Sequence, residues 1–286
     1  MTYYLGIDAG GSHCRSRLID AAGRVIGTGE TGPANTRVGI ERVHATLMEA
    51  AGLAIAAARL DTAAACAIRV GVGIAGLSRA GTRQALAAID WPFASVAFET
   101  DGVIANLGAH RGRDGAVLVI GTGSIAIVRV GGRDFAIGGY GFPISDEGSG
   151  AALGLSAMRH ALRALDGRTR RTPLSDAVAG RFGHQVAEAI AWMDQASPRH
   201  YAALAPLVMD YAEADDAIAR SIVEDAALHV EVFIETVFAR GAPACTLAGG
   251  LAPRMRPWLR ARTAQRLSEP LGDALDGALL LAGYRA

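Results

Sequence analysis

The sequence predicts an α/β protein built from two similar halves, and three observations support this expectation. Strand-like and helix-like segments alternate along the 286 residues, a pattern typical of α/β architectures. Two strand–glycine turn–strand segments open alike, with "GIDAGGS" from residue 6 and "VIGTGSI" from residue 119. The second half then becomes mainly helical. A chain of this length holds one large domain or two ordinary ones with full cores.

The first half is predicted to begin with a hairpin. "TYYLGID" and "CRSRLID" are two strands joined by a glycine turn, and "GRVIGTGE" is a third, returning strand. Residues 40–60 are rich in Ala and Leu with a helical period. "IRVGVGIAG" is a short apolar run bounded by glycines, which indicates a buried strand. "RAGTRQALAAI" is predicted as a helix and "SVAFETD" as a strand that ends on an acid.

The second half repeats the opening and then turns helical. "GAVLVIGTGSIAIVRVGGRDF" is again strand, turn and strand, and "GSGAALGLSAMRHALRAL" is a helix. A long helix is expected from about Glu213 to Arg240, where Gly241 and Pro243 stop it. "ACTLAGGLAP" is a short strand with a Gly-Gly turn, and "DALDGALLLAGYR" is a final helix. The polar segment "LGAHRGRD" at 107–114 is the best boundary between the halves.

Composition excludes several classes of protein. The chain carries 28 basic and 28 acidic residues, so its net charge gives no case for binding nucleic acid or an anionic membrane. Every basic residue other than histidine is Arg. Without a lysine, the chain has no Schiff-base residue for pyridoxal phosphate and no P-loop lysine. The strand lysine of protein kinases is absent as well.

Cysteine usage and apolar runs predict a cytoplasmic setting. Cys14, Cys66 and Cys245 are scattered and form no CxxC pair, so neither a disulfide framework nor a zinc or iron–sulfur site is expected. No basic segment followed by an apolar one marks a secretory signal at the start of the chain. The longest uncharged run, at 115–128, is shorter than the roughly 18 residues of a membrane helix.

Three glycine-rich turns are the candidate ligand-binding elements. Glycine lets backbone N–H groups approach a ligand closely, which is how phosphate oxygens are often bound. In the first turn Asp8 is placed to hold a hydrated Mg²⁺ beside Gly10 and Gly11, and Ser12 to donate to phosphate. Taken alone, each turn is equally consistent with a tight hairpin. The other turns comprise Gly121, Thr122, Gly123 and Ser124, then Gly249 and Gly250 at a strand-to-helix junction.

The order of these turns resembles the actin, hexokinase and Hsp70 superfamily, which has two phosphate motifs followed by an adenosine motif. Within it, the chain is similar to BadF/BadG/BcrA/BcrD-type ATPases and eukaryotic-type N-acetylglucosamine kinases. The segments "GIDAGGS", "GPANT", "GVGIAGL", "ETDGVIANLGA", "VLVIGTGSIAIV", "GGYGFPISDEGSGAALG" and "LAGGLAP" look like that family's motifs in its order and span most of the chain. "FPISDEGSGA" and the opening strand pair look most like bacterial glucosamine-specific kinases.

The resemblance implies a two-lobed actin-like, ribonuclease H-like fold of duplicated mixed sheets. It implies an N-terminal lobe at 1–108, with phosphate 1, the sugar site and the catalytic aspartate. It implies a C-terminal lobe at 109–286, with phosphate 2, the adenosine motif and a homodimer interface, the last helix packing back on the first lobe. ATP and Mg²⁺ would be the cofactors, with the ligand site between the lobes.

The resemblance also implies roles for individual residues. Asp101 aligns with the base that takes the proton of the sugar 6-hydroxyl, which suits phosphoryl transfer because that reaction needs an oriented nucleophile. Asn35 and Asp146 align with residues that bind the sugar hydroxyls, and Thr122 and Gly139 align near the sugar. The simpler interpretations are helix N-caps for Asp101 and Asp146 and a turn asparagine for Asn35.

The expected reaction is ATP-dependent phosphorylation of an amino sugar, most simply D-glucosamine to its 6-phosphate. Thr36 and Arg37 follow Asn35, where the acetylglucosamine kinases carry an aromatic residue, so no apolar wall for an acetyl group is evident. Glu147, next to Asp146, offers a charge for an ammonium group, although a solvent-facing acid is the simpler interpretation. N-acetylglucosamine and N-acetylmuramate remain alternative substrates.

Other classes of protein fit less well. The family's dehydratase activases need a cysteine-bound iron–sulfur cluster, and these three cysteines lack a cluster spacing. A sugar sensor without catalysis is a second alternative, but the first strand begins near residue 3, with no helix-turn-helix before it, and Asp101 is retained. In a Rossmann dehydrogenase the glycine turn should open a helix, whereas here it leads into an alternating strand.

Overall fold

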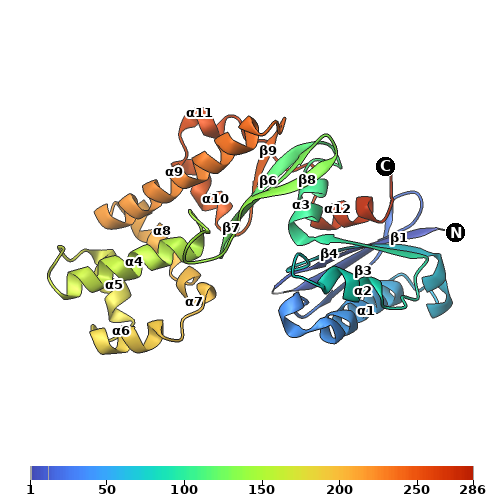
Figure 1. The fold of residues 1–286 in the computed structure, drawn as a ribbon, viewed down its shortest axis with the longest axis horizontal. Coiled ribbons are helices and arrows are strands. Elements are labelled where there is room, and N and C mark those ends of the chain that lie inside the picture. Colours follow the sequence, from blue (N-terminus) through green and yellow to red (C-terminus); the bar gives the residue numbers. More distant parts are fainter. Residues whose placement is uncertain (1, 12, 286) are drawn as a thin grey trace. The chain divides into compact units, whose positions relative to one another are not determined.

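The computed structural model describes residues 2–11 and 13–285, and of Thr62 it describes the backbone alone. The chain divides into two compact units (Figure 1). The first unit comprises Met1–Gly115 and Glu269–Ala286, and the second unit comprises Ala116–Ser268. The first unit is therefore assembled from both ends of the chain.

The first unit contains a five-stranded sheet in the order β3-β2-β1-β4-β5. β1 pairs antiparallel with β2, and β2 with β3, whereas β1–β4 and β4–β5 are parallel. The mixed sheet follows from the connections, because a short turn can join only antiparallel neighbours. The strands are β1 (Tyr3–Ala9), β2 (Cys14–Ile19), β3 (Val25–Thr31), β4 (Ile68–Ile74) and β5 (Ser95–Thr100).

The second unit repeats this arrangement with a four-stranded sheet in the order β8-β7-β6-β9. β7 and β8 are antiparallel, and β6 and β9 are parallel. The two sheets thus share a core in which a glycine turn joins the first two strands and a distant strand completes the parallel side. The strands are β6 (Gly115–Ile120), β7 (Ser124–Val130), β8 (Arg133–Gly138) and β9 (Cys245–Ala248).

Helices of the first unit bury the apolar faces of its sheet. α12, from the end of the chain, packs on α3 and on strands β1 and β4. Its close approach depends on glycine: a Cβ on Gly71 would lie 2.0 Å from the Ala278 carbonyl oxygen. The described helices are η1 (Thr36–Val38), α1 (Ile40–Ala57), η2 (Thr62–Ala67), α2 (Thr82–Ala87), α3 (Asp101–Ala109) and α12 (Ala274–Leu281).

The second unit carries most of the helical residues, as its sequence pattern indicates. Its described helices are α4 (Gly150–Leu165), α5 (Pro173–Gly180), α6 (Val186–Met193), α7 (Pro198–Ala202), α8 (Ala205–Glu213), α9 (Ala217–Ala239), α10 (Ala252–Met255), η3 (Arg256–Trp258) and α11 (Ala261–Ala264).

The expected elements form, with one helix start moved and several helices added. The helix expected from about Glu213 begins at Ala217, because Asp216 accepts hydrogen bonds from the N–H groups of Ile218 and Ala219 and so starts α9. No separate element was predicted for α5, α6, α7 and α8, or for the short helices η1, η2, η3 and α11. The C-terminal helix α12 belongs to the first unit.

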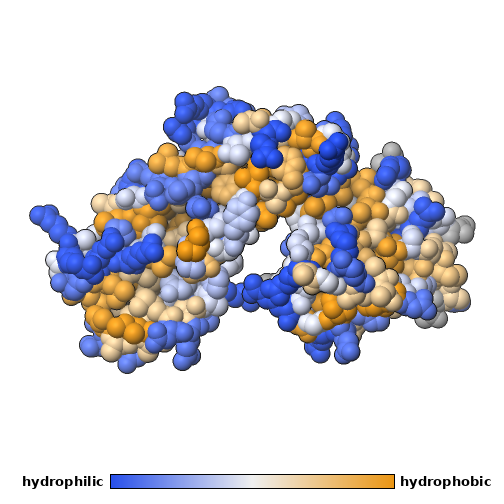
Figure 2. All heavy atoms as spheres, viewed as in Figure 1, coloured by the Kyte–Doolittle hydropathy of each residue, from blue (hydrophilic) through white to orange (hydrophobic). Residues whose placement is uncertain are grey.

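Each unit has its own hydrophobic core. Leu5, Ile7 and Val72 lie at the centre of the first, and Leu118 and Ile234 lie at the centre of the second. Figure 2 shows hydrophilic and hydrophobic residues interspersed over the visible face of both units. Across residues 2–11 and 13–285, no helix has the combined length and hydropathy that crossing a bilayer requires.

Candidate active site

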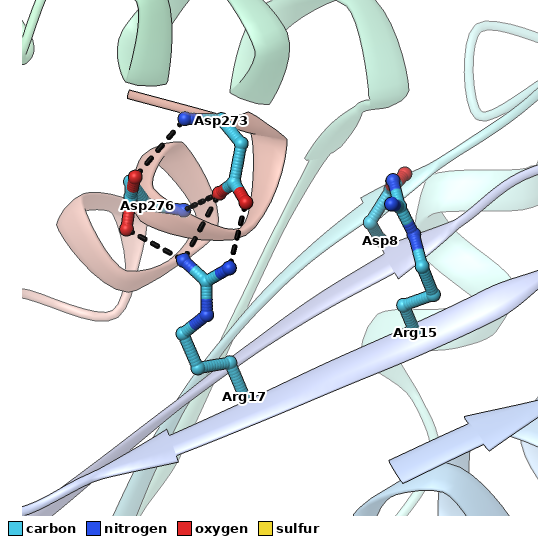
Figure 3. A network of polar contacts seen from close by, with 5 residues as sticks. All are labelled: Asp8, Arg15, Arg17, Asp273 and Asp276. Atoms are coloured by element: carbon cyan, nitrogen blue, oxygen red, sulfur yellow. Dashed lines mark hydrogen bonds and ion pairs between the residues drawn. The ribbon is translucent and has the colours of Figure 1, made fainter. Parts of the chain in front are cut away.

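The first glycine turn joins β1 to β2 and brings a carboxylate against a guanidinium. Asp8 and Arg15 are register partners on these strands, and Arg15 Nη2 lies 2.6 Å from Asp8 Oδ2 (Figure 3). The Asp8 side chain is only 15% exposed. The Gly10 N–H donates to the carbonyl oxygen of His13 at 3.0 Å, which closes the turn. Ser12, predicted to donate to phosphate, lies outside the described residues.

One glycine in each turn presents an open face. Around the ideal Cβ positions of Gly11, Gly121 and Gly250, no atom lies within 4 Å among the described residues. Glycine at these places leaves the backbone N–H groups accessible to a ligand that a side chain would obstruct. This openness fits the phosphate-binding and adenosine-binding roles expected of the three turns.

Asp101 is the first residue of α3, directly after β5. The N-cap of this helix is Thr100, whose Oγ1 accepts from the Val103 N–H at 3.2 Å. The simpler interpretation of Asp101 as the N-cap is therefore wrong. Asp101 Oδ1 accepts from the N–H of its neighbour Gly102 at 3.0 Å.

The environment of Asp101 raises the pKa of its carboxyl. Burial raises the pKa of the Asp101 carboxyl above the ordinary aspartate value. The hydrogen bond from Gly102 acts in the opposite direction, and the negative charge of Asp8 raises the pKa further. A partly buried carboxyl with a raised pKa near a second carboxylate is typical of groups that move protons in catalysis.

The second glycine turn, Gly121–Ser124, is fastened to the segment that begins at Asp146. The Gly150 N–H donates to the Gly121 carbonyl oxygen at 2.8 Å. The Ala151 N–H donates to the Thr122 carbonyl oxygen at 3.1 Å, and Ser124 Oγ donates to the Glu147 carbonyl oxygen at 2.7 Å. The two segments are therefore held together as one local structure.

The Asp146 carboxylate itself lies against this turn. Its Oδ1 accepts from the Ser124 N–H at 3.4 Å, and a Cβ on Gly123 would lie 2.9 Å from its Oδ2. Asp146 has a φ of +67°, a conformation in which aspartate is more common than most residues. The N-cap of α4 is Ser149, so the interpretation of Asp146 as a helix N-cap is wrong.

The protonation of Asp146 resembles that of Asp101. Burial raises the pKa of the Asp146 carboxyl, and the charge of Glu147 adds to the effect. Backbone hydrogen bonds from Ser124 and Phe142 lower it in part. Glu147 accepts from Ser145 Oγ at 3.3 Å.

Asn35 lies at the start of the short helix η1. Its Oδ1 accepts from the Arg37 N–H at 2.9 Å, which is the turn role that its sequence context suggests. Within residues 2–11 and 13–285 nothing accepts from its Nδ2, which has two donors to offer a ligand. Thr36, buried beside it, donates from Oγ1 to the Gly76 carbonyl oxygen at 2.9 Å. In the second unit, Gly139 has a φ of +72°.

The third turn joins β9 to α10, as the sequence predicts. Gly249 has a φ of +93°, and a Cβ there would lie 2.4 Å from the Ile120 carbonyl oxygen. The Leu251 N–H donates to the same oxygen at 3.1 Å. The turn is thereby held against the end of β6, immediately before the Gly121–Ser124 turn.

Arg15 is the site residue that sequence reasoning missed. The available signal was the hairpin itself, because antiparallel pairing across the predicted turn places residue 15 opposite residue 8. An arginine there holds Asp8 by a charge-assisted hydrogen bond. It also adds a positive charge beside the open glycine turn.

The carboxylates of Asp8 and Asp101 suit a Mg²⁺ ion that is bound jointly by the protein and by substrate phosphates. In the described ranges 2–11 and 13–285, His, Cys, Asp and Glu form no group of three or more that could hold a metal by themselves. Mg²⁺ is commonly bound by one or two carboxylates, several waters and substrate phosphates. Asp8, with Asp101 close enough for its charge to be felt, fits that arrangement.

Duplicated mixed sheets with glycine turns at corresponding positions define a two-unit, actin-like ATPase fold. A sequence model of the BadF/BadG/BcrA/BcrD ATPase family matches residues 5–282, and the chain belongs to this family. The expected fold class and family are confirmed. The glycine turn after β1 leads into strand β2 and not into a helix, so the Rossmann alternative is wrong.

Three known proteins illustrate the similarity. The chain is 36% identical to the glucosamine kinase GspK of Vibrio cholerae over 99% of its own length and 96% of the relative's. A crystal structure from Chromobacterium violaceum, provisionally named an N-acetylglucosamine kinase, matches with 33% identity and a TM-score of 0.90 over 99% of both chains. The ROK hexokinase of Thermus thermophilus shares the fold at 21% identity, with a TM-score of 0.58 over 98% of both chains.

Proposed function

We propose that the protein transfers the γ-phosphoryl group of ATP to the 6-hydroxyl of D-glucosamine. The sugar-kinase class follows from the family and from full-length similarity to a glucosamine kinase. The observation that carries the proposal is Asp101, a partly buried carboxyl with a raised pKa that is free of the helix-capping role.

In the proposed reaction Asp101 accepts the proton of the sugar 6-hydroxyl as its oxygen attacks the γ-phosphorus. The bond from the γ-phosphorus to the β,γ-bridging oxygen breaks, and ADP leaves with that oxygen. The turn at Gly10 and Gly11 and the turn at residues 121–124 hold phosphate oxygens, with the N–H groups of Gly11, Thr122 and Gly123 as the backbone donors, and Ser12 adds a hydroxyl donor. Asp8 would hold Mg²⁺ through water, and this ion would neutralise charge on the transferred phosphoryl group.

The residues proposed to bind the sugar are Asn35, Asp101, Thr122, Gly139 and Asp146. The free donors of Asn35 suit a hydroxyl oxygen, and the carboxylate of Asp146 suits a hydroxyl hydrogen. Gly249 and Gly250 are proposed to lie against the adenosine. The first unit contributes Asp8, Gly10, Gly11, Asn35 and Asp101 to this set. The second unit contributes the remaining proposed ligands of the described ranges.

Glucosamine is proposed over N-acetylglucosamine because of the residues around Asn35. Thr36 is buried and fixed to Gly76, and Arg37 is polar, so neither offers an apolar surface for an acetyl group. The adjacent carboxylates of Asp146 and Glu147 suit an ammonium group by charge. N-acetylglucosamine and N-acetylmuramate are the competing substrates.

A coupled assay of ADP release tests the proposal. The panel is glucosamine, N-acetylglucosamine, glucose and N-acetylmuramate, each with and without Mg²⁺. We expect the highest kcat/KM for glucosamine and no turnover without a divalent cation. A higher kcat/KM for N-acetylglucosamine would overturn the substrate and leave the kinase class intact. Binding of sugar and ATP without turnover would support the sugar-sensor alternative.

Iron–sulfur chemistry is disfavoured by the placement of the cysteines. The family's dehydratase activases bind a cluster through cysteine thiolates. Here Cys14, Cys66 and Cys245 lie in three separate elements, β2, η2 and β9, and they form no cluster spacing in the sequence.

A cytoplasmic homodimer completes the proposal. The second unit exposes large apolar side chains on one stretch of α9, where Leu228 is 52% and Val232 is 64% exposed. Residues four apart lie on one helix face, so these two form an apolar strip that a second copy could cover. Sedimentation equilibrium of the V232E variant tests it, with a shift toward monomer expected.

A further inference from the structure

The first unit contains a cavity that none of the predicted site residues lines. Its volume is about 590 Å³, within the range of small-molecule sites, roughly 300–1,000 Å³. It is formed by the end of α3, the segment before α12, α12 itself and the β2–β3 turn. All of its lining residues belong to the first unit.

One side of the cavity is apolar. Ile19, Val25, Leu279 and Leu280 line it, and Val25 is 57% exposed. Exposed β-branched and aliphatic side chains beside a cavity offer surface whose burial by a ligand is favourable, by about 25 cal/mol per Å². The Tyr284 ring, held edge-on against Tyr4 with ring centres 5.4 Å apart, adds an aromatic surface.

The polar lining has an excess of positive charge. Arg17, Arg111 and Arg285 face a single carboxylate, that of Asp276. Arg17 already binds acids: its Nη2 donates to Asp273 Oδ2 at 2.6 Å and its Nη1 to Asp276 Oδ1 at 2.7 Å (Figure 3). The guanidinium groups of Arg111 and Arg285 remain as the other positive charges of the lining.

Neither Arg111 nor Arg285 has a carboxylate partner in the described part of the chain. Arg285 Nη1 donates to the carbonyl oxygens of Leu280 and Tyr284, at 3.0 and 2.9 Å, which leaves its other N–H donors. Among residues 2–11 and 13–285, nothing hydrogen-bonds or ion-pairs with the Arg111 guanidinium, and nothing hydrogen-bonds with the Tyr284 hydroxyl. That hydroxyl lies directly over the Gly23 turn, where a Cβ would be 2.1 Å from it.

We propose that this cavity binds a small organic anion with an apolar body, such as an aromatic or aliphatic carboxylate or phosphomonoester. Arg111 and Arg285 bind the anionic group by charge-assisted hydrogen bonds, and the Tyr284 hydroxyl supplies a further donor. The body of the ligand lies against Ile19, Val25 and α12. This binding site is separate from the proposed kinase reaction, and it stands whether or not the substrate is glucosamine.

Strand β2 links this cavity to the first glycine turn. Arg15 and Arg17 are two residues apart and share one face of the strand. Arg15 holds Asp8, while Arg17 holds the Asp273–Asp276 pair that starts α12 (Figure 3).

Isothermal titration of the full-length protein with phenyl phosphate tests the proposal. This probe combines an aromatic body with a phosphate dianion. The titration is done with saturating Mg²⁺ and a non-hydrolysable ATP analogue, so that the nucleotide site is filled. We expect one saturable site, and at least about tenfold weaker binding for R111A and for R285A, the scale of losing a hydrogen bond to a charged group.

Two controls make the result specific. R42A removes an exposed arginine of α1 that does not line the cavity and should leave the affinity unchanged. Inorganic phosphate and phenol, which carry only the charge or only the ring, should bind at least about tenfold more weakly than phenyl phosphate. Circular dichroism of each variant confirms that it is folded.

Three outcomes would overturn the proposal: no saturable binding beside the ATP analogue, equal affinity in folded R111A and R285A, or equal affinity for inorganic phosphate. The last would show that the apolar wall is not used. Failure of glucosamine turnover in the kinase assay would not affect any of these readouts.

Discussion

The Asp101 carboxyl is the residue on which the proposed chemistry depends most. Asp101→Asn keeps the shape of the side chain but cannot accept the proton of the sugar hydroxyl. We expect kcat to fall by about 10²–10⁴-fold, the usual contribution of a positioned base. ATP affinity should change little, because the glycine turns and the metal would hold the nucleotide.

ADP release and titration with an ATP analogue measure these two quantities. Asp90→Asn, which changes an exposed aspartate of the same unit, is the matched control and should keep normal kcat. Near-normal kcat in a folded Asp101→Asn protein would remove Asp101 from the mechanism and make Asp146 the next candidate.

The raised pKa of Asp101 predicts the pH dependence of the reaction. A base works when deprotonated, and burial together with the charge of Asp8 keeps the Asp101 carboxyl protonated to a higher pH than an ordinary aspartate. As pH falls, kcat/KM should therefore decline at a pH above the ordinary aspartate value. A pH profile in which the decline follows an unshifted carboxyl would contradict the assignment.

Single residues show most clearly which features could be predicted from the sequence. The Asp8 position and the three glycine turns were predictable because turn chemistry is local and is written in adjacent residues. The capping residues were not: the sequence favoured Asp101 and Asp146 as caps, and the structure uses Thr100 and Ser149 instead. A shift of one or three residues at a helix start depends on backbone angles that the side-chain pattern does not determine.

At the scale of elements, the start of α9 depends on one buried acid. Asp216 accepts from the N–H groups of Leu174, Ile218 and Ala219, so it joins α5 to α9. Burial acts to raise the pKa of Asp216, but these hydrogen bonds together lower it below the ordinary value. The ionised form is therefore the one that the folded state favours.

We expect Asp216→Ala to reduce the free energy of unfolding by about 2–4 kcal/mol, the sum of a lost cap and unsatisfied buried donors. Because its folded-state pKa is depressed, the stabilisation is present above the unfolded pKa, about 3.9, and is lost as pH falls through the folded pKa. Urea unfolding in a Trp91→Phe background measures it, since Trp192 and Trp258 then report on the second unit. Asp225→Ala, an exposed acid on α9, should change stability by less than about 0.5 kcal/mol.

The crossing of α3 and α12 depends on glycine, because a side chain would not fit between the two backbones. A Cβ on Gly277 would lie 1.8 Å from the Ile104 carbonyl oxygen, and a Cβ on Gly108 would lie 1.8 Å from that of Asp273. Backbone atoms cannot move aside as a flexible side chain does. We expect Gly277→Ala to destabilise the first unit by about 1–3 kcal/mol, as overpacking does.

Gly52→Ala is the opposite control. Gly52 lies inside α1 with no described atom within 4 Å of its Cβ position, so alanine there should stabilise the helix by about 0.5–1 kcal/mol. Urea unfolding in a background with Trp192→Phe and Trp258→Phe measures both variants, since Trp91 then reports on the first unit. Equal effects of the two substitutions would contradict the close crossing.

The hairpins were predictable from short-range patterns, whereas the place of α12 was expected only from the family resemblance. Apolar runs and glycine turns mark each hairpin, because the connected strands are neighbours in both sequence and space. The local sequence at residues 274–281 does not indicate that this helix packs on β1 and β4. The contact joins residues far apart in the sequence, and it is the glycines at 6, 71, 108 and 277 that permit the close approach.

At the scale of the whole molecule, the first unit includes the end of the chain, and we expect that it does not fold without it. Truncation after Ser268 removes α12 and exposes the apolar faces of β1, β4 and α3 that it covers. The second unit is one continuous segment with its own core and should stay folded. Limited proteolysis with mass spectrometry should then find cleavage throughout residues 2–115 and protection of 116–268. Protection of both segments would show that α12 is dispensable.

The edge-on contact of Tyr4 with Tyr284 has a mechanical consequence. It holds the first strand and the last residues of the chain together in one unit, so tension applied at the two ends acts on the first unit alone. The second unit carries no load until that contact and the strand pairs behind it have separated. Under force the molecule therefore comes apart in a fixed order, with the second unit shielded by the first.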